Sequence, residues 1–110
     1  MQTHFESCYN NHNAILVLQE IADKITHRVI MSTIDSPKTV SQICKENKLP
    51  QSSTYKKIQK LQNYGLISID KIDIDSKGKK VVFYRSKIKS LEVNLNCDGI
   101  LLQFNKNNQL

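Results

Sequence analysis

The stretch TVSQICKENKLPQSSTYKKIQKLQNYGL, residues 39–66, decides how the rest of the chain is organised. Thr39 is followed three residues later by Gln42, which is the capping-box spacing that begins a helix. Pro50 can open a second helix, because the first residues of a helix need no amide donor. Gly65 marks the end of that second helix. The stretch therefore predicts two short helices joined by a tight turn.

The second of these helices has two different faces. Thr54, Ile58 and Leu61 point one way at about 100° per residue. The opposite face carries Ser52, Lys56, Gln59 and Asn63, with Tyr55 and Lys60 flanking it. Hydroxyl and amide groups can read base edges in the major groove of DNA, and lysines can neutralise phosphates. An amphipathic helix without a partner is the alternative, and the preceding helix and turn favour the DNA-binding interpretation.

The charge of the chain lies in its middle. The 110 residues carry a formal net charge of +6. Residues 37–66 hold six lysines against Glu46 alone, and residues 67–89 hold seven cations against three aspartates, whereas both ends are slightly acidic. Such a segment suits a polyanion, because neutralised phosphates release their counterions. Charge alone leaves a solvated, lysine-rich surface as an equal alternative.

Residues 1–13 are polar and lack a period, which predicts a disordered N-terminal tail. His4, Cys8 and His12 recur there every four residues, a spacing from which a soft-metal site can be built. Three ligands leave such a site incomplete, and the segment is a poor helix former. We therefore predict a tail that holds no metal or other cofactor. Metal binding by His4, Cys8 and His12 is the alternative that the sequence leaves open.

From residue 14 the apolar residues follow helical spacing. The main stripe consists of Ile15, Leu18, Ile21, Ala22, Ile25 and Val29. The pattern allows one helix through Ile34, or two helices with a break near Asp23, which could cap the second. Leu16 and Val17 fall off the stripe, so a second copy of the chain could cover this surplus apolar surface. Pro37 stops the helical region.

Two hairpins are predicted after residue 65. In the first, isoleucines alternate with polar residues, and the alternation shifts by one position at Lys71, as a β-bulge would cause. A turn at residues 75–80 then leads into a partner strand at residues 81–85. In the second, residues 91–95 and 100–104 flank a turn that contains Gly99. Residues 14–105 thus form one domain, and residues 106–110 are expected to be frayed.

Several function classes are disfavoured by composition. Three cysteines at wide spacing argue against a disulfide framework and fit a reducing compartment. No apolar run is long enough to span a bilayer, so no membrane partner and a cytoplasmic location are expected. No nucleophile motif, phosphate-binding glycine loop or completed metal set is visible, so the chain is not expected to be an enzyme. Asp70, Asp73 and Asp75 could collect a divalent cation, but solvent-facing strand positions are the commoner explanation.

Three segments together, ITHRVIMSTI at residues 25–34, the opening stretch, and GKKVVFYRS at residues 78–86, resemble the winged helix-turn-helix of small ArsR-like and MarR-like transcription regulators, especially archaeal ones. The resemblance covers roughly residues 21–87. It implies an α+β fold of three or four helices with a β-hairpin wing, to which this chain adds a C-terminal β-hairpin. It also implies a homodimer on double-stranded DNA.

By this resemblance, a recognition helix at residues 50–64 would enter the major groove, and a wing at residues 75–80 would touch the backbone or the minor groove. The expected DNA-binding residues are Gln51, Ser52, Ser53, Tyr55, Lys56, Lys60, Lys77, Lys79 and Lys80. The helix after Thr39 offers only Cys44 where metal-sensing relatives carry a cysteine cluster, so a metal-sensing role is not implied. Many relatives end in a dimerising helix that this chain lacks, which leaves the mode of dimerisation open.

The predicted function is sequence-specific DNA binding as a transcription regulator, with a homodimer formed through the N-terminal helix. The alternative is a winged-helix module that binds another protein within a larger assembly.

Overall fold

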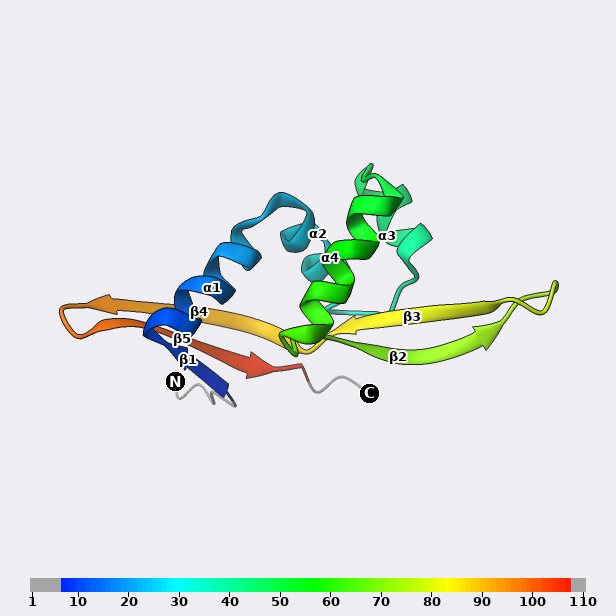
Figure 1. The fold of residues 1–110 in the computed structure, drawn as a ribbon. Helices are drawn as coiled ribbons and strands as arrows, with labels where there is room; N and C mark the ends of the chain where they lie inside the picture. The colour runs from blue at the N-terminus through cyan, green and yellow to red at the C-terminus, as the bar shows by residue number, and fades with distance from the viewer. Residues whose placement is uncertain (1–6, 108–110) are drawn as a thin grey trace.

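The computed structural model describes residues 7–107, and it confirms a mixed α+β fold with four helices and two antiparallel hairpins. In chain order the elements are β1 (Ser7–Asn10), α1 (Asn11–Ala22), α2 (Lys24–Ser32), α3 (Val40–Asn47), α4 (Gln51–Asn63), β2 (Ile67–Ile74), β3 (Lys80–Ser86), β4 (Ile88–Asn96) and β5 (Gly99–Lys106). The molecule measures 56 × 28 × 21 Å. The two hairpins extend in opposite directions along its long axis, and the helices lie on one side of them (Figure 1).

The first helical region is divided in two at Asp23. The carboxylate of Asp23 accepts hydrogen bonds from the amides of Ile25 and Thr26, at 3.0 and 3.1 Å, and so caps α2. The helix ends at Ser32, before the expected limit at Ile34, and the backbone amide of the C-cap residue Thr33 donates to the Ile30 carbonyl at 3.1 Å. The two-helix interpretation is therefore correct.

The turn between α3 and α4 follows the local signals of the sequence. The Thr39 amide donates to Oε1 of Gln42 at 2.9 Å, and the Gln42 amide donates to Oγ1 of Thr39 at 3.1 Å, which completes the predicted capping box. Lys48 ends α3 in the left-handed conformation. Gly65 follows α4 with φ 76°, the conformation for which a glycine was expected.

The hairpin formed by β2 and β3 is a two-stranded antiparallel sheet. Its register shifts between Ile69 and Lys71, so that Asp70 is the extra residue of the predicted bulge. Tyr84 of β3 also exchanges two backbone hydrogen bonds with Lys38, of 2.9 and 2.8 Å, in the segment between α2 and α3. This bridge ties the base of the hairpin to the helices, while its tip extends beyond them (Figure 1).

The second sheet has the strand order β1-β5-β4 and corrects the predicted N-terminal tail. Residues 7–10 pair antiparallel with β5, and α1 begins at Asn11 rather than after residue 13. The prediction was wrong here because a partner strand distant in sequence supplies the hydrogen bonds that make these polar residues a strand. Residues 1–6 lie outside the described part of the chain.

The C-terminal end also differs from expectation. Lys106 is the last residue of β5, and Asn107 is 9% exposed rather than frayed. The side-chain amide of Asn107 donates to the carbonyls of Ile34 and Ser86, at 2.8 and 2.9 Å. These bonds connect Asn107 to the segment that follows α2 and to the last residue of β3. Residues 108–110 lie outside the described part.

One apolar core connects the helices to both sheets. It consists of Ala14, Val17, Val29, Ile30, Ile43, Ile58, Leu61, Leu66, Ile67, Tyr84, Ile88, Leu102 and Phe104. The predicted stripe is confirmed in part, because Val29 belongs to the core and Leu18, Ile21 and Ile25 pack against it. It was wrong at the start of α1, where Ile15 is 46% exposed and Val17, predicted to lie off the stripe, is 2% exposed. Because α1 packs on β1 and β5, the position of that sheet decides which face is buried.

Candidate nucleic-acid interface

A groove of about 790 Å³ lies between α4 and the tip of the β2–β3 hairpin. It is lined by Val40, Gln51, Ser52, Tyr55, Lys56, Lys79 and Lys80. We refer to these residues as the α4–wing groove. The fold thus brings six of the nine residues that the sequence predicted together on one concave surface, although they come from two elements distant in the chain.

The roll of α4 about its axis sets which side chains face this groove. Thr54, Ile58 and Leu61 are all 0% exposed and pack beneath the helix. Because side chains one helical turn apart share a face, burying this set directs Ser52 and Lys56 outward. The amide nitrogen of the Gln51 side chain donates to Oγ of Ser41 at 2.8 Å, so this side chain is held against α3.

The wing tip is shaped by Asp75. Its Oδ1 accepts hydrogen bonds from the backbone amides of Lys77 and Lys79, at 2.9 and 2.8 Å. Gly78 completes the turn with φ 79°. The carboxylate is therefore engaged with the backbone, while no ion pair forms with Lys79 or Lys80 in the described part of the chain.

The other aspartates of the wing are neutralised locally. Asp70 accepts from Nε of Arg85 at 3.1 Å, and Asp73 lies 3.6 Å from Nζ of Lys71. Without these cations, both carboxylates would repel a phosphate along the strand. Because each acid has its own cation, the lysines at the tip remain as the positive charge of this hairpin.

Three predicted residues lie outside the groove. Ser53 is exposed on the first turn of α4, and Lys77 is exposed in the wing turn, but neither lines the groove. Lys60 faces α1 instead, because its Nζ lies 3.0 Å from Oε2 of Glu20. The structure therefore places Lys60 apart from the residues that it was predicted to join.

Glu20 forms the centre of a charged network that the sequence did not reveal. It is 6% exposed and accepts a hydrogen bond of 3.0 Å from the Thr26 hydroxyl. Lys57 contacts Oε1 of Glu20 at 3.3 Å and Oδ1 of Asp23 at 3.5 Å. Together with Lys60, these groups tie α4 to the α1–α2 junction. Glu20 lies 37 positions from Lys57 in the sequence, and no local spacing indicates such a contact.

This network shifts the pKa values of its members. Burial raises the pKa of the Glu20 carboxyl, but hydrogen bonds from Lys60, Thr26 and Lys57 outweigh it, and the pKa lies below its ordinary value of 4.5. The hydrogen bond to Glu20 in turn raises the pKa of Lys60. Both shifts favour the charged pair.

We expect Glu20→Gln to lower the free energy of unfolding by about 2 kcal/mol near neutral pH, because charge-assisted hydrogen bonds are lost. A carboxyl with a lowered folded-state pKa stabilises the protein above its unfolded value of 4.5, and this contribution disappears as pH falls through the folded pKa. The difference between wild type and variant should therefore shrink in acid. Urea unfolding at neutral and acidic pH measures it.

Glu92→Gln is the matched control for this prediction, because Glu92 is an exposed carboxylate on β4. It should have little effect at either pH. A difference between wild type and Glu20→Gln that stays the same from neutral to acidic pH would contradict the role assigned to the charged carboxylate.

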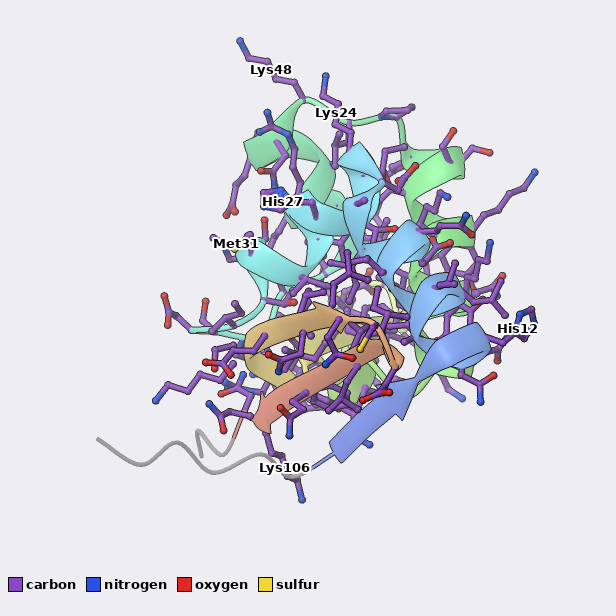
Figure 2. All side chains as sticks on the ribbon, turned by 90° about the vertical axis from the view of Figure 1, so that its left-hand side faces the viewer. His12, Lys24, His27, Met31, Lys48 and Lys106 are labelled. Atoms are coloured by element: carbon purple, nitrogen blue, oxygen red, sulfur yellow. The ribbon has the colours of Figure 1, made fainter. Side chains whose placement is uncertain are left out.

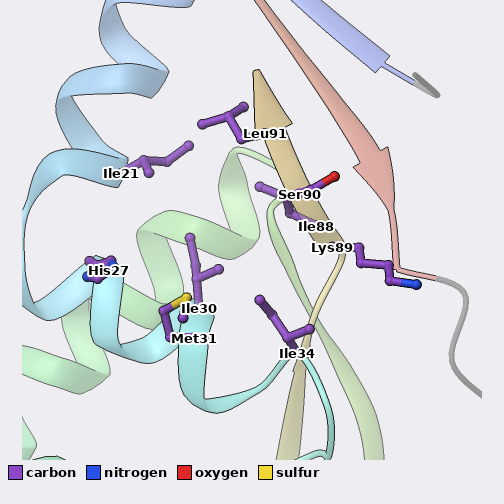
Figure 3. A pocket seen from close by; sticks show the side chains of 9 residues that line it. All are labelled: Ile21, His27, Ile30, Met31, Ile34, Ile88, Lys89, Ser90 and Leu91. Carbon is purple, nitrogen blue, oxygen red and sulfur yellow. The ribbon is translucent and has the colours of Figure 1, made fainter. Parts of the chain in front are cut away.

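Two further hollows have a different chemical character. One of about 150 Å³ lies between α2 and β4 (Figure 3). Its wall is aliphatic and includes Ile21, Ile30, Ile88 and Leu91, and Lys89 points away from it. Such a mainly aliphatic wall does not suit a phosphate. The other, of about 400 Å³, is bordered by α2 and the end of α3 and carries cations.

The described residues contain no cluster of three or more His, Cys, Asp or Glu side chains that could hold a metal. His12 is exposed, whereas His4 and the side chain of Cys8 lie outside the described part, so their predicted spacing stays untested. Cys44 is buried and Cys97 is exposed.

Between residues 7 and 107, no helix has the length and apolar character needed to cross a membrane. No protein-family model and no curated protein sequence matches the chain.

Proposed function

We propose that this protein is a winged-helix transcription regulator that binds double-stranded DNA in a sequence-specific manner. The observation that carries the proposal is the α4–wing groove, which joins the exposed face of a short helix to two lysines at a hairpin tip. In this arrangement α4 enters the major groove, and residues 75–80 contact the adjacent backbone or minor groove. An α-helix fits the major groove of B-DNA in width.

The chemistry of the groove supports separate roles for its residues. Gln51 carries an amide and Ser52 a hydroxyl, groups that hydrogen-bond to base edges. Lys56, Lys79 and Lys80 carry ammonium groups without an internal carboxylate partner in the described part, which suits them to phosphates. Tyr55 is 47% exposed beside them and can pack on the sugar-phosphate backbone.

The order of elements also supports the winged-helix assignment. Helices α2, α3 and α4 precede a hairpin whose base is bridged to the segment between α2 and α3 through Lys38 and Tyr84. This bridge holds the hairpin in a defined position beside α4. The position is what a wing requires, because it must meet DNA at the same time as the recognition helix.

The test is binding of the purified protein to DNA duplexes at several salt concentrations. If the groove lysines meet phosphates, the logarithm of affinity should fall linearly with the logarithm of salt, with a slope of about −0.9 per contact. Selection of bound duplexes from a random pool should then yield a shared sequence. Absence of binding to any duplex, or binding that does not respond to salt, would refute the proposal.

We further propose that the regulator acts as a homodimer through α1. The exposed side chains of Ile15 and Leu16 leave an apolar surface on this helix, and Val93 and Leu95 of β4 are 46% and 78% exposed. Burial of such side chains is what drives association of two chains. A dimer would place two α4 helices on a two-fold site, and the spacing of selected half-sites reports it.

A protein-binding module is the second candidate function. The observation in its favour is the exposure of Ile72 and Ile74 on the wing, which are 51% and 71% exposed. A protein partner could bind these isoleucines through apolar contacts, without using the basic residues of the groove. Light scattering that finds a monomer, together with failure to bind any duplex, would favour this candidate over the regulator.

A further inference from the structure

A second group of cations lies outside the α4–wing groove, beside the hollow between α2 and the end of α3. Lys24 is the first residue of α2, Arg28 follows one turn later, and Lys48 ends α3. All three border the hollow of about 400 Å³ described above. Lys24 and Lys48 project from the same end of the molecule (Figure 2). We refer to Lys24, Arg28 and Lys48 as the basic surface.

The acids near this surface are already engaged. Glu46 borders the same hollow, but its Oε2 lies 2.7 Å from Nζ of Lys38. Asp23 precedes Lys24, but its carboxylate caps α2 and lies 3.5 Å from Nζ of Lys57. Within residues 7–107, none of the three cations of the basic surface forms an ion pair. Three positive charges therefore face solvent together.

The backbone at Lys48 adds an independent observation. Lys48 has φ 55° and ψ 51°, and it is the one non-glycine residue with positive φ in the described part. Glycine or asparagine adopts this conformation more readily at the end of a helix. A lysine here carries a backbone cost, while its ammonium group has no ion-pair partner in the described chain. Residues held in such sparsely populated backbone conformations cluster at sites that contact other molecules.

We propose that the basic surface binds backbone phosphates of duplex DNA that flank the segment met by α4, on the side away from the wing. This inference rests on the proposed DNA-binding function and enlarges its contact area. Lys48 lies two residues before Pro50, the N-cap of α4, so the turn connects the basic surface directly to the first turn of that helix. The first turn of α4 then has phosphate-binding cations on both sides.

Two variants test the contact, and one serves as a matched control. Lys48→Gly removes the charge and suits the backbone conformation, so it should unfold in urea at the same concentration as wild type or a higher one. Lys24→Gln with Arg28→Gln removes the other two charges. Lys106→Gln removes an exposed cation at the opposite end of the molecule, labelled in Figure 2.

Affinity for a mixed-sequence duplex is measured against salt for all four proteins. We expect the slope to become shallower by about 0.9 for Lys48→Gly and by about 1.8 for the double variant, with no change for Lys106→Gln. Hydroxyl-radical footprinting on a selected duplex should show loss of protection on one flank of each half-site, while the rest of the footprint remains.

The outcomes separate this inference from the function on which it rests. If wild type binds duplexes with a salt-dependent affinity but both variants behave like Lys106→Gln, the basic surface is refuted and the α4–wing groove stands. If wild type binds no duplex, the proposed function fails and the inference fails with it. A footprint that weakens evenly along its whole length also refutes a flanking contact, because it indicates a general charge effect.

Discussion

Replacing Lys56, Lys79 and Lys80 together by glutamine is expected to make the slope of log affinity against log salt shallower by about 2.7, since each phosphate contact contributes about 0.9. At low salt, counterion release favours binding by roughly tenfold per contact, so the affinity for duplex DNA should fall about a thousandfold. Glutamine keeps a side chain of similar reach without the charge. Titration of a labelled duplex by fluorescence anisotropy at several salt concentrations measures both quantities.

The matched control removes three cations that do not line the α4–wing groove. Lys87, Lys89 and Lys106 are exposed and form no ion pair in the described chain, and Lys87→Gln, Lys89→Gln and Lys106→Gln lower the net charge by the same amount. If this triple variant loses as much affinity as the groove variant, net charge rather than the groove governs binding. A large loss in the groove variant alone supports the α4–wing groove as the contact surface.

The second large effect concerns the packing of α4 on the core. Ile58 is 0% exposed and belongs to the core beneath α4. We expect Ile58→Ala to lower the free energy of unfolding by about 3 kcal/mol, because it removes buried methyl and methylene groups and leaves a cavity. Urea unfolding followed by circular dichroism measures the loss.

Gln59→Ala is the control for this substitution, because Gln59 is the next residue along α4 and is exposed. Its effect should stay within about 0.5 kcal/mol. If Ile58→Ala costs no more than Gln59→Ala, the roll of α4 assigned here is wrong, and so is the set of side chains that it directs into the groove.

Features that depend on a few neighbouring residues could be predicted from the sequence. The capping box of Thr39 and Gln42, the bulge before Lys71 and the positive φ of Gly65 were expected and occur. The Asp23 cap was one of two alternatives and also occurs. The two caps satisfy backbone groups within a few residues, so their partners are visible in the local sequence. The bulge and the glycine follow from local side-chain alternation and from the helix end, which are also visible there.

The candidate site could be predicted only in part. The face of α4 that carries Ser52 and Lys56 follows from helical periodicity once Thr54, Ile58 and Leu61 are taken as the buried set. Lys60 shows the limit of this reasoning. Periodicity places it on the flank of the helix, but the distant Glu20 engages its ammonium group at 3.0 Å. Side-chain charge in the sequence does not indicate which cations are already neutralised within the fold.

The sequence by itself determined the limits of α3 and α4, the turn between them, and which face of α4 is apolar, because these properties arise from backbone hydrogen bonds and side-chain spacing over short distances. Tertiary structure alone decided that residues 7–10 are a strand, that Val17 rather than Ile15 is buried, and that the wing lysines border α4. The physical reason is that each of these outcomes depends on a partner supplied by a distant segment, and local sequence carries no record of that partner.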